Sequence, residues 1–452
     1  MPHDERKWII IGAGVAGISA AIGCALAGKK VLLIEQSSYL GGRARSFTDT
    51  TTGEIIDNGQ HVLMGCYTSL LFALDTLGTS HLLRRQSALN VQFIDADGQR
   101  DTLDTSGLPG KAGIVLGILN LKNVSWLSKI RALELALRMQ LGAVNAAGKT
   151  ADEFLLSYNQ TPEMIERFWT PIILATLNAS PNTASASLLL EVMRRAFFGG
   201  RRASQILISS VGLSALFEPL TAWLAERGGE ILLNTRIESL QLANGSVDSV
   251  LTSRGDVFAA DTVIAAIPPK HLLRMLPSEL AASKEFDRFT SFRFSPIVSV
   301  YLWLDRPFFP NDFAAMLGTT TQWIFNRRRL AHASEATLKK YPEHLSLTVS
   351  AGDELVELSP EAVVNSCFTE LRAAFPLAGK ATLLASKVIK EKSATFLATP
   401  AIEPLRPQPE TSVPNLFLAG DWTATGLPAT LEGASQSGFS AAKSALSINI
   451  SR

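Results

Sequence analysis

Residues 8–35 read WIIIGAGVAGISAAIGCALAGKKVLLIE: an apolar run, a glycine-rich turn, a second apolar stretch and a final carboxylate. The pattern predicts a strand, a turn, a helix up to about Gly28 and a second strand that ends at Glu35. A strand, turn, helix and strand in this order form the first half of a dinucleotide-binding unit. The stretch therefore predicts a Rossmann-like α/β fold.

The turn of this unit carries the candidate phosphate site. Gly12 permits a tight turn, Gly14 lets the backbone approach a pyrophosphate, and Gly17 lets the helix and strand pack closely. Ala16 belongs to the same turn, at the helix N-terminus that stabilises an anion. Glu35 follows Gly17 by 18 positions, which is close to the usual spacing of an acid that binds a ribose.

Two further segments lie far apart in the chain. Residues 39–45 read YLGGRAR, and residues 415–423 read NLFLAGDWT, followed by LEGAS at 431–435. The first resembles the Gly-Gly-Arg segment of the amine oxidase and phytoene desaturase flavoproteins, and the second resembles their C-terminal flavin motif. The resemblance implies FAD rather than NAD as the cofactor. Since no residue is placed for a covalent link, we expect the FAD to be noncovalent.

The resemblance also implies which residues bind FAD. Gly420 and Asp421 are expected at the phosphate and ribityl chain, and the helix that opens near Gly433 is expected to direct its positive end to the flavin N1 and C2 carbonyl. Ile237 is expected to contact the adenine side through its backbone. Beyond the first turn and Glu35, the implied set is Gly42, Arg43, Gly59, Ile237, Gly420, Asp421, Glu432, Gly433 and Ala434.

Composition argues against several classes of protein. The 42 Lys and Arg against 41 Asp and Glu give a net charge of +1, which provides no reason to expect a nucleic-acid partner. Cys24, Cys66 and Cys367 show no CxxC spacing, so we expect neither disulfides nor a metal site, and we expect a reducing, cytoplasmic location. Residues 8–28 are uncharged and long enough to span a bilayer, but their glycines fall at nucleotide-turn spacing. No spanning helix or signal peptide is therefore expected.

The motifs predict a discontinuous organisation. We expect a Rossmann-like FAD-binding domain of the amine-oxidase type, assembled from residues 1–79, 206–274 and 407–452. The remaining residues, 80–205 and 275–406, are expected to form a mixed α+β substrate domain. Within these segments, helices are predicted at 213–227 and 360–375, and strands at 230–237, 262–269, 297–304 and 345–349, with hairpin turns at Asn244-Gly245 and Arg254-Gly255.

The first substrate segment contains a strongly apolar block. Residues 114–121 are nearly all apolar, an apolar stripe runs on from Trp126 to Leu141, and five basic residues against one acid lie between Lys111 and Arg138. Such a helix suits peripheral contact with an anionic membrane, at the inner face of the cytoplasmic membrane. The alternative is a core helix with a solvated basic edge. A basic and aromatic patch at 194–202 is expected to be protein surface.

Two shorter motifs narrow the resemblance. Residues 56–67 read IDNGQHVLMGCY and residues 424–434 read ATGLPATLEGA. They resemble the hydroxysqualene dehydroxylase family of bacterial squalene and hopanoid synthesis. The resemblance implies a long isoprenoid lipid substrate, whose hydroxyl is replaced by hydrogen at the expense of reduced FAD.

The reaction requires a proton for the leaving hydroxyl. His61 is the candidate general acid, and its alternative is a structural histidine that hydrogen-bonds the loop or cofactor. A carotenoid desaturase or isomerase of the phytoene type, and a non-catalytic prenyl-lipid binding protein of the same fold, remain alternative functions. Because no second nicotinamide-type glycine motif is present, we expect an external flavin reductant. The oligomeric state is left open.

Overall fold

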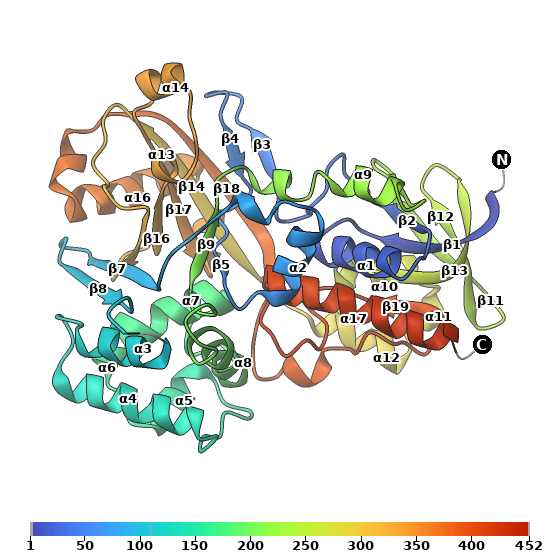
Figure 1. Cartoon of the computed structure of the whole chain (residues 1–452), viewed down its shortest axis with the longest axis horizontal. Helices are drawn as coiled ribbons and strands as arrows, with labels where there is room; N and C mark the ends of the chain where they lie inside the picture. The colour runs from blue at the N-terminus through green and yellow to red at the C-terminus, as the bar shows by residue number, and fades with distance from the viewer. Residues whose placement is uncertain (1–2, 109, 451–452) are drawn as a thin grey trace.

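The computed structural model describes residues 3–108 and 110–450 and shows two lobes, each built around a large β-sheet (Figure 1). The first sheet has the strand order β10-β2-β1-β13-β12-β11, with β19 paired to β13. Pairings among β10, β2, β1, β13 and β19 are parallel, whereas β11 and β12 form antiparallel hairpins. The bounds are β1 His3–Ile11, β2 Val31–Ile34, β10 Glu230–Leu232, β11 Ile237–Ala243, β12 Ser246–Thr252, β13 Val257–Ala265 and β19 Leu416–Leu418.

This sheet draws its strands from all three segments predicted for the FAD-binding domain. Two helices from opposite ends of the chain, α1 (Val15–Leu26) and α17 (Leu431–Ile450), pack closely beside it (Figure 1). A Cβ on Gly438 would lie 2.1 Å from the Ala16 carbonyl oxygen, and the Ser19 and Ser435 hydroxyls are 2.8 Å apart. The predicted α/β class is confirmed, while the exact domain boundaries stay a prediction.

The second sheet has the order β18-β14-β17-β16-β15-β7-β8. The helix α16 (Pro360–Ala374) contributes apolar side chains to the same core as this sheet. The bounds are β7 Asn90–Asp95, β8 Arg100–Asp104, β14 Phe294–Leu304, β15 Phe313–Leu317, β16 Trp323–Asn326, β17 Glu343–Ser350 and β18 Leu383–Phe396. Strands β7 and β8 come from the segment 80–205, so that segment contributes to the sheet as well as to the helices.

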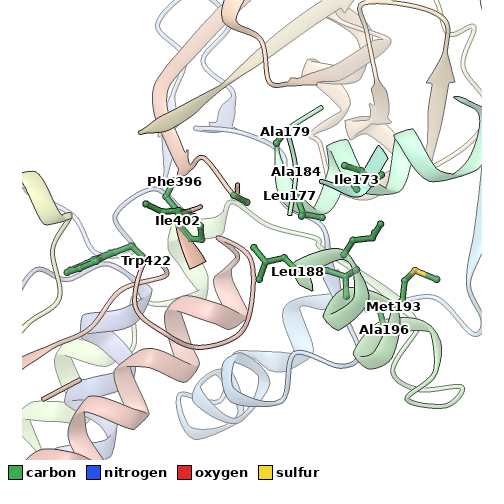
Figure 2. Close-up of a cluster of buried hydrophobic side chains, with 14 of the residues drawn as sticks. Ile173, Leu177, Ala179, Ala184, Leu188, Met193, Ala196, Phe396, Ile402 and Trp422 are labelled. Atoms are coloured by element: carbon green, nitrogen blue, oxygen red, sulfur yellow. The ribbon is translucent and has the colours of Figure 1, made fainter. Parts of the chain in front are cut away.

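Helices from the same segment form the third part of the molecule, below the second sheet in Figure 1. They include α3 (Gly110–Leu119), α4 (Trp126–Gln140), α5 (Ala151–Ser157), α7 (Thr170–Leu177) and α8 (Ala186–Val192). Figure 2 shows part of the core that joins them to the rest of the chain: Ile173 and Leu188 belong to one buried cluster with Phe396, Ile402 and Trp422. The helical part and the C-terminal FAD segment therefore share a core.

Most predicted elements agree with the structure, including β14, β17, α16 and both hairpin turns. Three predictions were wrong in extent. The strand expected at 262–269 is the end of β13, which ends at Ala265, and Pro269 begins the helix α10 (Pro269–Met275). The helix expected at 213–227 is a 3-10 turn, Leu213–Leu216, followed by α9 (Leu220–Ala225), because Pro219 cannot continue a helix formed before it. The strand expected at 230–237 is interrupted after Leu232, because Asn234 adopts a left-handed φ of 53°.

Residues 8–28 form the end of β1, the glycine turn and α1. Within 3–108 and 110–450, no helix is long and apolar enough to cross a membrane.

Candidate active site

The glycine turn has the geometry of a phosphate cradle. Gly12 has a φ of 95°, and a Cβ there would lie 2.6 Å from the Ala266 carbonyl oxygen. A Cβ on Gly17 would lie 1.8 Å from the Gly12 carbonyl oxygen. A Cβ on Gly14, in contrast, would meet no atom within 4 Å, although this residue directly precedes α1. The space above Gly14 thus fits a pyrophosphate at a helix N-terminus.

Glu35 is buried at the carboxyl end of β2 and holds the turn in place. Its carboxylate accepts hydrogen bonds from the Ala13 N–H at 2.7 Å and the Ser37 N–H at 2.8 Å. The backbone of residues 234–235 donates to the carbonyl oxygens of Ser37 and Glu35, which brings Ile237 to this side of the site. Sequence reasoning expected a ribose ligand here but missed the structural bond to the turn.

The Gly-Gly-Arg loop lies directly on the turn. The Gly41 N–H donates to the Ala13 carbonyl, and a Cβ on Gly42 would lie 3.0 Å from the Gly14 Cα. Gly42 has a φ of 60°, which glycine adopts without strain. The loop therefore covers one side of the space above Gly14.

Arg43 and Asp421 are 378 positions apart in the chain but form an ion pair. The Arg43 Nη2 lies 2.8 Å from both Asp421 carboxylate oxygens, and its Nη1 donates to the Ala394 carbonyl. Asp421 follows Gly420, whose φ of 149° and close approach to the Trp422 indole leave no room for a Cβ. Both residues were predicted as FAD ligands, and the structure places them side by side.

The first turn of α17 is tied to a second helix, α2 (Thr68–Thr76). The Glu432 carboxylate accepts from the Ser69 N–H at 3.0 Å and the Leu70 N–H at 2.9 Å, so it caps α2. The Gly433 N–H donates to the Thr430 hydroxyl. The prediction that Glu432 binds the cofactor stays a prediction, and its carboxylate is engaged by α2. Nothing local in the sequence indicates a cap between helices so far apart.

The loop 57–61 packs against the second sheet. The Tyr301 hydroxyl donates to the Asp57 carbonyl, and a Cβ on Gly59 would lie 3.1 Å from the Ser299 Oγ. The His61 Nδ1 lies 2.8 Å from the Gly59 carbonyl oxygen, and burial lowers the pKa of the imidazole below its ordinary value. The acid role of His61 stays a prediction.

Sequence reasoning missed a buried arginine beneath this loop. The Arg327 Nη1 donates to the Gln60 side chain at 3.0 Å and lies 3.9 Å from the Asp57 carboxylate. Its side chain is 5% exposed, so this cation is removed from bulk water. A single arginine outside any motif gives no indication that it lies under a distant loop.

A small apolar pocket with a free volume of about 30 Å³ opens beside the first turn of α17. Met64, Val192 and Leu427 provide apolar walls, and Tyr67, Arg195 and Thr430 provide polar groups.

The sheet topology orients a dinucleotide across the site. Ligands of open α/β sheets bind outside the carboxyl ends of the strands. Glu35 follows β2 at one side, and Gly420 follows β19 at the other, with β1 and β13 between them. A dinucleotide whose ribose meets Glu35 and whose pyrophosphate meets Gly14 therefore extends toward Asp421 and the N-terminus of α17. These features define a dinucleotide-binding protein of the α/β class.

Comparison with known proteins identifies the family. The family model described as "flavin containing amine oxidoreductase" matches residues 15–446. Hydroxysqualene dehydroxylase of Sinorhizobium fredii is 33% identical, and the match covers 97% of this chain and 98% of that protein. The chain therefore belongs to the flavin-containing amine oxidoreductase family and, within it, to the hydroxysqualene dehydroxylases. It is an FAD-dependent oxidoreductase.

Two further proteins are similar to this chain at lower sequence identity. The 15-cis-phytoene desaturase of Glycine max is 25% identical, and the match covers 97% of this chain and 79% of the plant protein. The structure of wild-type putrescine oxidase bound to putrescine superposes with a TM-score of 0.71 and 16% identity, and the match covers 99% of each chain. The solved structure supports the fold alone.

Proposed function

We propose that this chain reduces hydroxysqualene to squalene with reduced FAD. The observation that carries the proposal is the match to a hydroxysqualene dehydroxylase along nearly the full length of both chains. The phytoene desaturase match has lower identity and leaves about a fifth of the plant protein uncovered. The apolar pocket beside α17 provides a surface suited to an isoprenoid chain.

The proposed reaction is balanced as a two-electron reduction. When bound, reduced FAD would supply a hydride. The C–O bond of the substrate would break, a C–H bond would form, and the hydroxyl would leave as water with a proton from an acid of the chain, for which His61 is the candidate. The chain itself would hold the cofactor through the turn Gly12–Gly17, Glu35, Arg43 and Asp421. Apolar walls would keep bulk water from an allylic cation. A separate reductase or free reduced flavin would recharge the cofactor.

We further propose that α4 rests on the cytoplasmic surface of a membrane. Its outer face carries five large apolar side chains, each 56–72% exposed: Trp126, Leu127, Ile130, Leu137 and Leu141. The basic side chains expected from the sequence make contacts within the chain, although one acid against five basic residues leaves the segment 111–138 with a net positive charge. Arg131 and Arg138 both pair with Glu134, and Lys129 is buried, with its ammonium bound to the Leu119 carbonyl. Apolar insertion and the net positive charge of the segment would therefore both contribute to the contact.

The experiment that tests the reaction is a product analysis. The purified protein, with FAD and a chemical reductant, is incubated with hydroxysqualene and separately with phytoene, and products are identified by mass spectrometry. We expect squalene from hydroxysqualene and no product from phytoene. Desaturation of phytoene without reduction of hydroxysqualene would favour a carotenoid desaturase. A protein that takes up no FAD would favour a non-catalytic lipid-binding protein.

A further inference from the structure

We propose that the Tyr67 hydroxyl donates a hydrogen bond to the hydroxyl of the substrate at the polar end of the apolar pocket. This inference rests on the proposed function, since it concerns the alcohol that the enzyme would reduce. Tyr67 would thereby decide how the alcohol is oriented and how it is distinguished from the hydrocarbon product.

The position of Tyr67 is fixed by the contact between two helices. Tyr67 is the N-cap residue of α2, and the Glu432 carboxylate accepts hydrogen bonds from backbone N–H groups in the first turn of that helix. Glu432 lies in the first turn of α17, toward which the topology directs the far half of the dinucleotide. The pocket that Tyr67 lines therefore lies at the end of the site where the reacting part of the cofactor is expected.

Most other polar groups of the pocket already have protein partners. The Thr176 hydroxyl donates to the Ile172 carbonyl at 2.7 Å. Arg195 binds the Glu191 carboxylate at 2.6 Å and the Gln436 side chain at 3.1 Å. The Glu432 carboxylate caps α2, as described above.

Cys66, Tyr67 and Thr430 are the remaining polar residues among those that line the pocket. Cys66 offers only a weak S–H donor. The Thr430 hydroxyl accepts from the Gly433 N–H at 3.0 Å, and its single hydrogen can go to the Pro428 carbonyl at 3.3 Å or to the Tyr67 hydroxyl that it contacts. When it goes to Tyr67, the hydrogen of the phenol is available to a ligand. A phenol has two lone pairs and one hydrogen, so Tyr67 can contact both Thr430 and a ligand.

The surroundings of Tyr67 keep it a neutral donor. Burial raises the pKa of the phenol above its ordinary value, and the nearby Cys66 and Glu432 add to the effect. The hydroxyl therefore retains its hydrogen over the whole working pH range. An alcohol that enters an apolar pocket without a partner loses its bonds to water, so a fixed donor recovers part of that cost. Squalene has no hydroxyl and gains nothing from Tyr67, which favours product release.

The test measures equilibrium binding of two ligands to the FAD-loaded protein, from the change in flavin absorbance. Wild type should bind hydroxysqualene about fivefold to tenfold more tightly than squalene, the effect of one hydrogen bond of about 1 kcal/mol. Tyr67→Phe keeps the ring and should bind both ligands equally, with the affinity for squalene unchanged. The matched control is Tyr158→Phe, which removes a tyrosine hydroxyl that accepts from the Asn145 N–H.

The outcomes separate this inference from the proposed function. Equal affinity of wild type for the two ligands would overturn the role of Tyr67, and this measurement does not depend on any variant folding. A preference for hydroxysqualene that survives in Tyr67→Phe, or is lost equally in Tyr158→Phe, would also overturn it. If wild type prefers hydroxysqualene but yields no squalene in the product analysis, the proposed reaction fails while the binding role of Tyr67 stands.

Discussion

Gly14 and Gly17 are three positions apart, yet a methyl group has opposite consequences at the two residues. A Cβ on Gly14 enters open space, and its φ of −70° and ψ of 175° suit alanine. We expect Gly14→Ala to fold with an unchanged Tm and to bind FAD at least about tenfold more weakly, because the methyl group occupies the place of the pyrophosphate. FAD titration and thermal unfolding of the apoprotein measure the two effects.

Gly17→Ala provides the contrast, since its Cβ would collide with the Gly12 carbonyl oxygen. This variant should show both a lower Tm and weaker FAD binding. Normal FAD affinity in Gly14→Ala would show that the cofactor does not approach this turn.

His61 is predicted to act through its charged form. Its Nδ1 lies against the Gly59 carbonyl, so the neutral ring directs an unprotonated Nε2 outward. A general acid therefore needs the imidazolium, whose pKa is lowered by burial from its ordinary 6.5. We expect kcat/KM to fall as the pH rises through this lowered pKa, and His61→Ala to slow reduction roughly a hundredfold with FAD still bound. A rate that stays level above pH 7, or turnover restored to His61→Ala by saturating FAD, would contradict the acid role.

Single residues were predictable where their roles depend on near neighbours. The spacing of Gly12, Gly14 and Gly17 within one turn predicted where backbone must approach backbone, and the contacts at Gly12 and Gly17 agree. The cap that Glu432 forms on α2 was not predictable, because its partners lie 362 and 363 positions away. One sequence contains no measure of distance between such segments.

For the α4 helix, too, the sequence predicted the local pattern but not the contacts with the rest of the chain. Its apolar stripe was evident from the sequence, and the structure leaves that stripe exposed. The sequence did not show that Lys129 turns inward to a carbonyl or that Glu134 engages two arginines. These contacts hold the basic side chains in place, but α4 keeps a net positive charge, since Glu134 is its one acid against three basic residues.

Liposome flotation measures what the exposed face of α4 contributes. We expect wild type to float with anionic vesicles and to float less at high salt, because the segment keeps a net positive charge, and we expect Ile130→Asp with Leu137→Asp to stay in the soluble fraction. Both side chains are more than half exposed, so the protein should fold normally. The matched control is Leu377→Asp with Leu384→Asp, two exposed leucines elsewhere in the chain, which should float as wild type does. Equal flotation of all three proteins would show that α4 does not bind the membrane.

Across the whole molecule, a buried ionic cluster joins the loop before β4 (Ile55–Asp57) to the second sheet. Glu54 binds Arg328 through two contacts of 2.6 Å and the Trp303 indole N–H at 2.9 Å. Its carboxylate also lies 3.3 Å from the His344 Nδ1. The His344 Nε2 is buried with no partner among the described residues. Burial lowers the pKa of His344 from 6.5 to about 4, so the ring is neutral in the folded protein at pH 7.

This cluster predicts how stability changes with pH. Between pH 6.5 and about 4 the unfolded chain binds a proton at His344 that the folded protein excludes, so stability falls as the pH falls. Glu54, whose pKa is lowered to about 2, loses its contribution only below about pH 4.5. Between pH 6.5 and pH 5 we expect His344 to lower the free energy of unfolding by up to about 2 kcal/mol. The decrease in Tm over this range should be smaller in His344→Gln and unchanged in the exposed control His332→Gln. If Tm decreased equally with pH in all three proteins, His344 would be excluded as the cause of the decrease.

The ion pair between Arg43 and Asp421 has a consequence for folding during protein synthesis. The two residues are separated by 378 positions, so at about 5–20 residues per second the ribosome makes Asp421 about 20–75 s after Arg43. During that interval β19 and α17 do not exist, and the face of α1 that α17 later covers has nothing to pack against. The nascent chain must therefore be shielded by chaperones or protected by its other contacts. FAD can be captured in its complete site only after Asp421 and the first turn of α17 have been made.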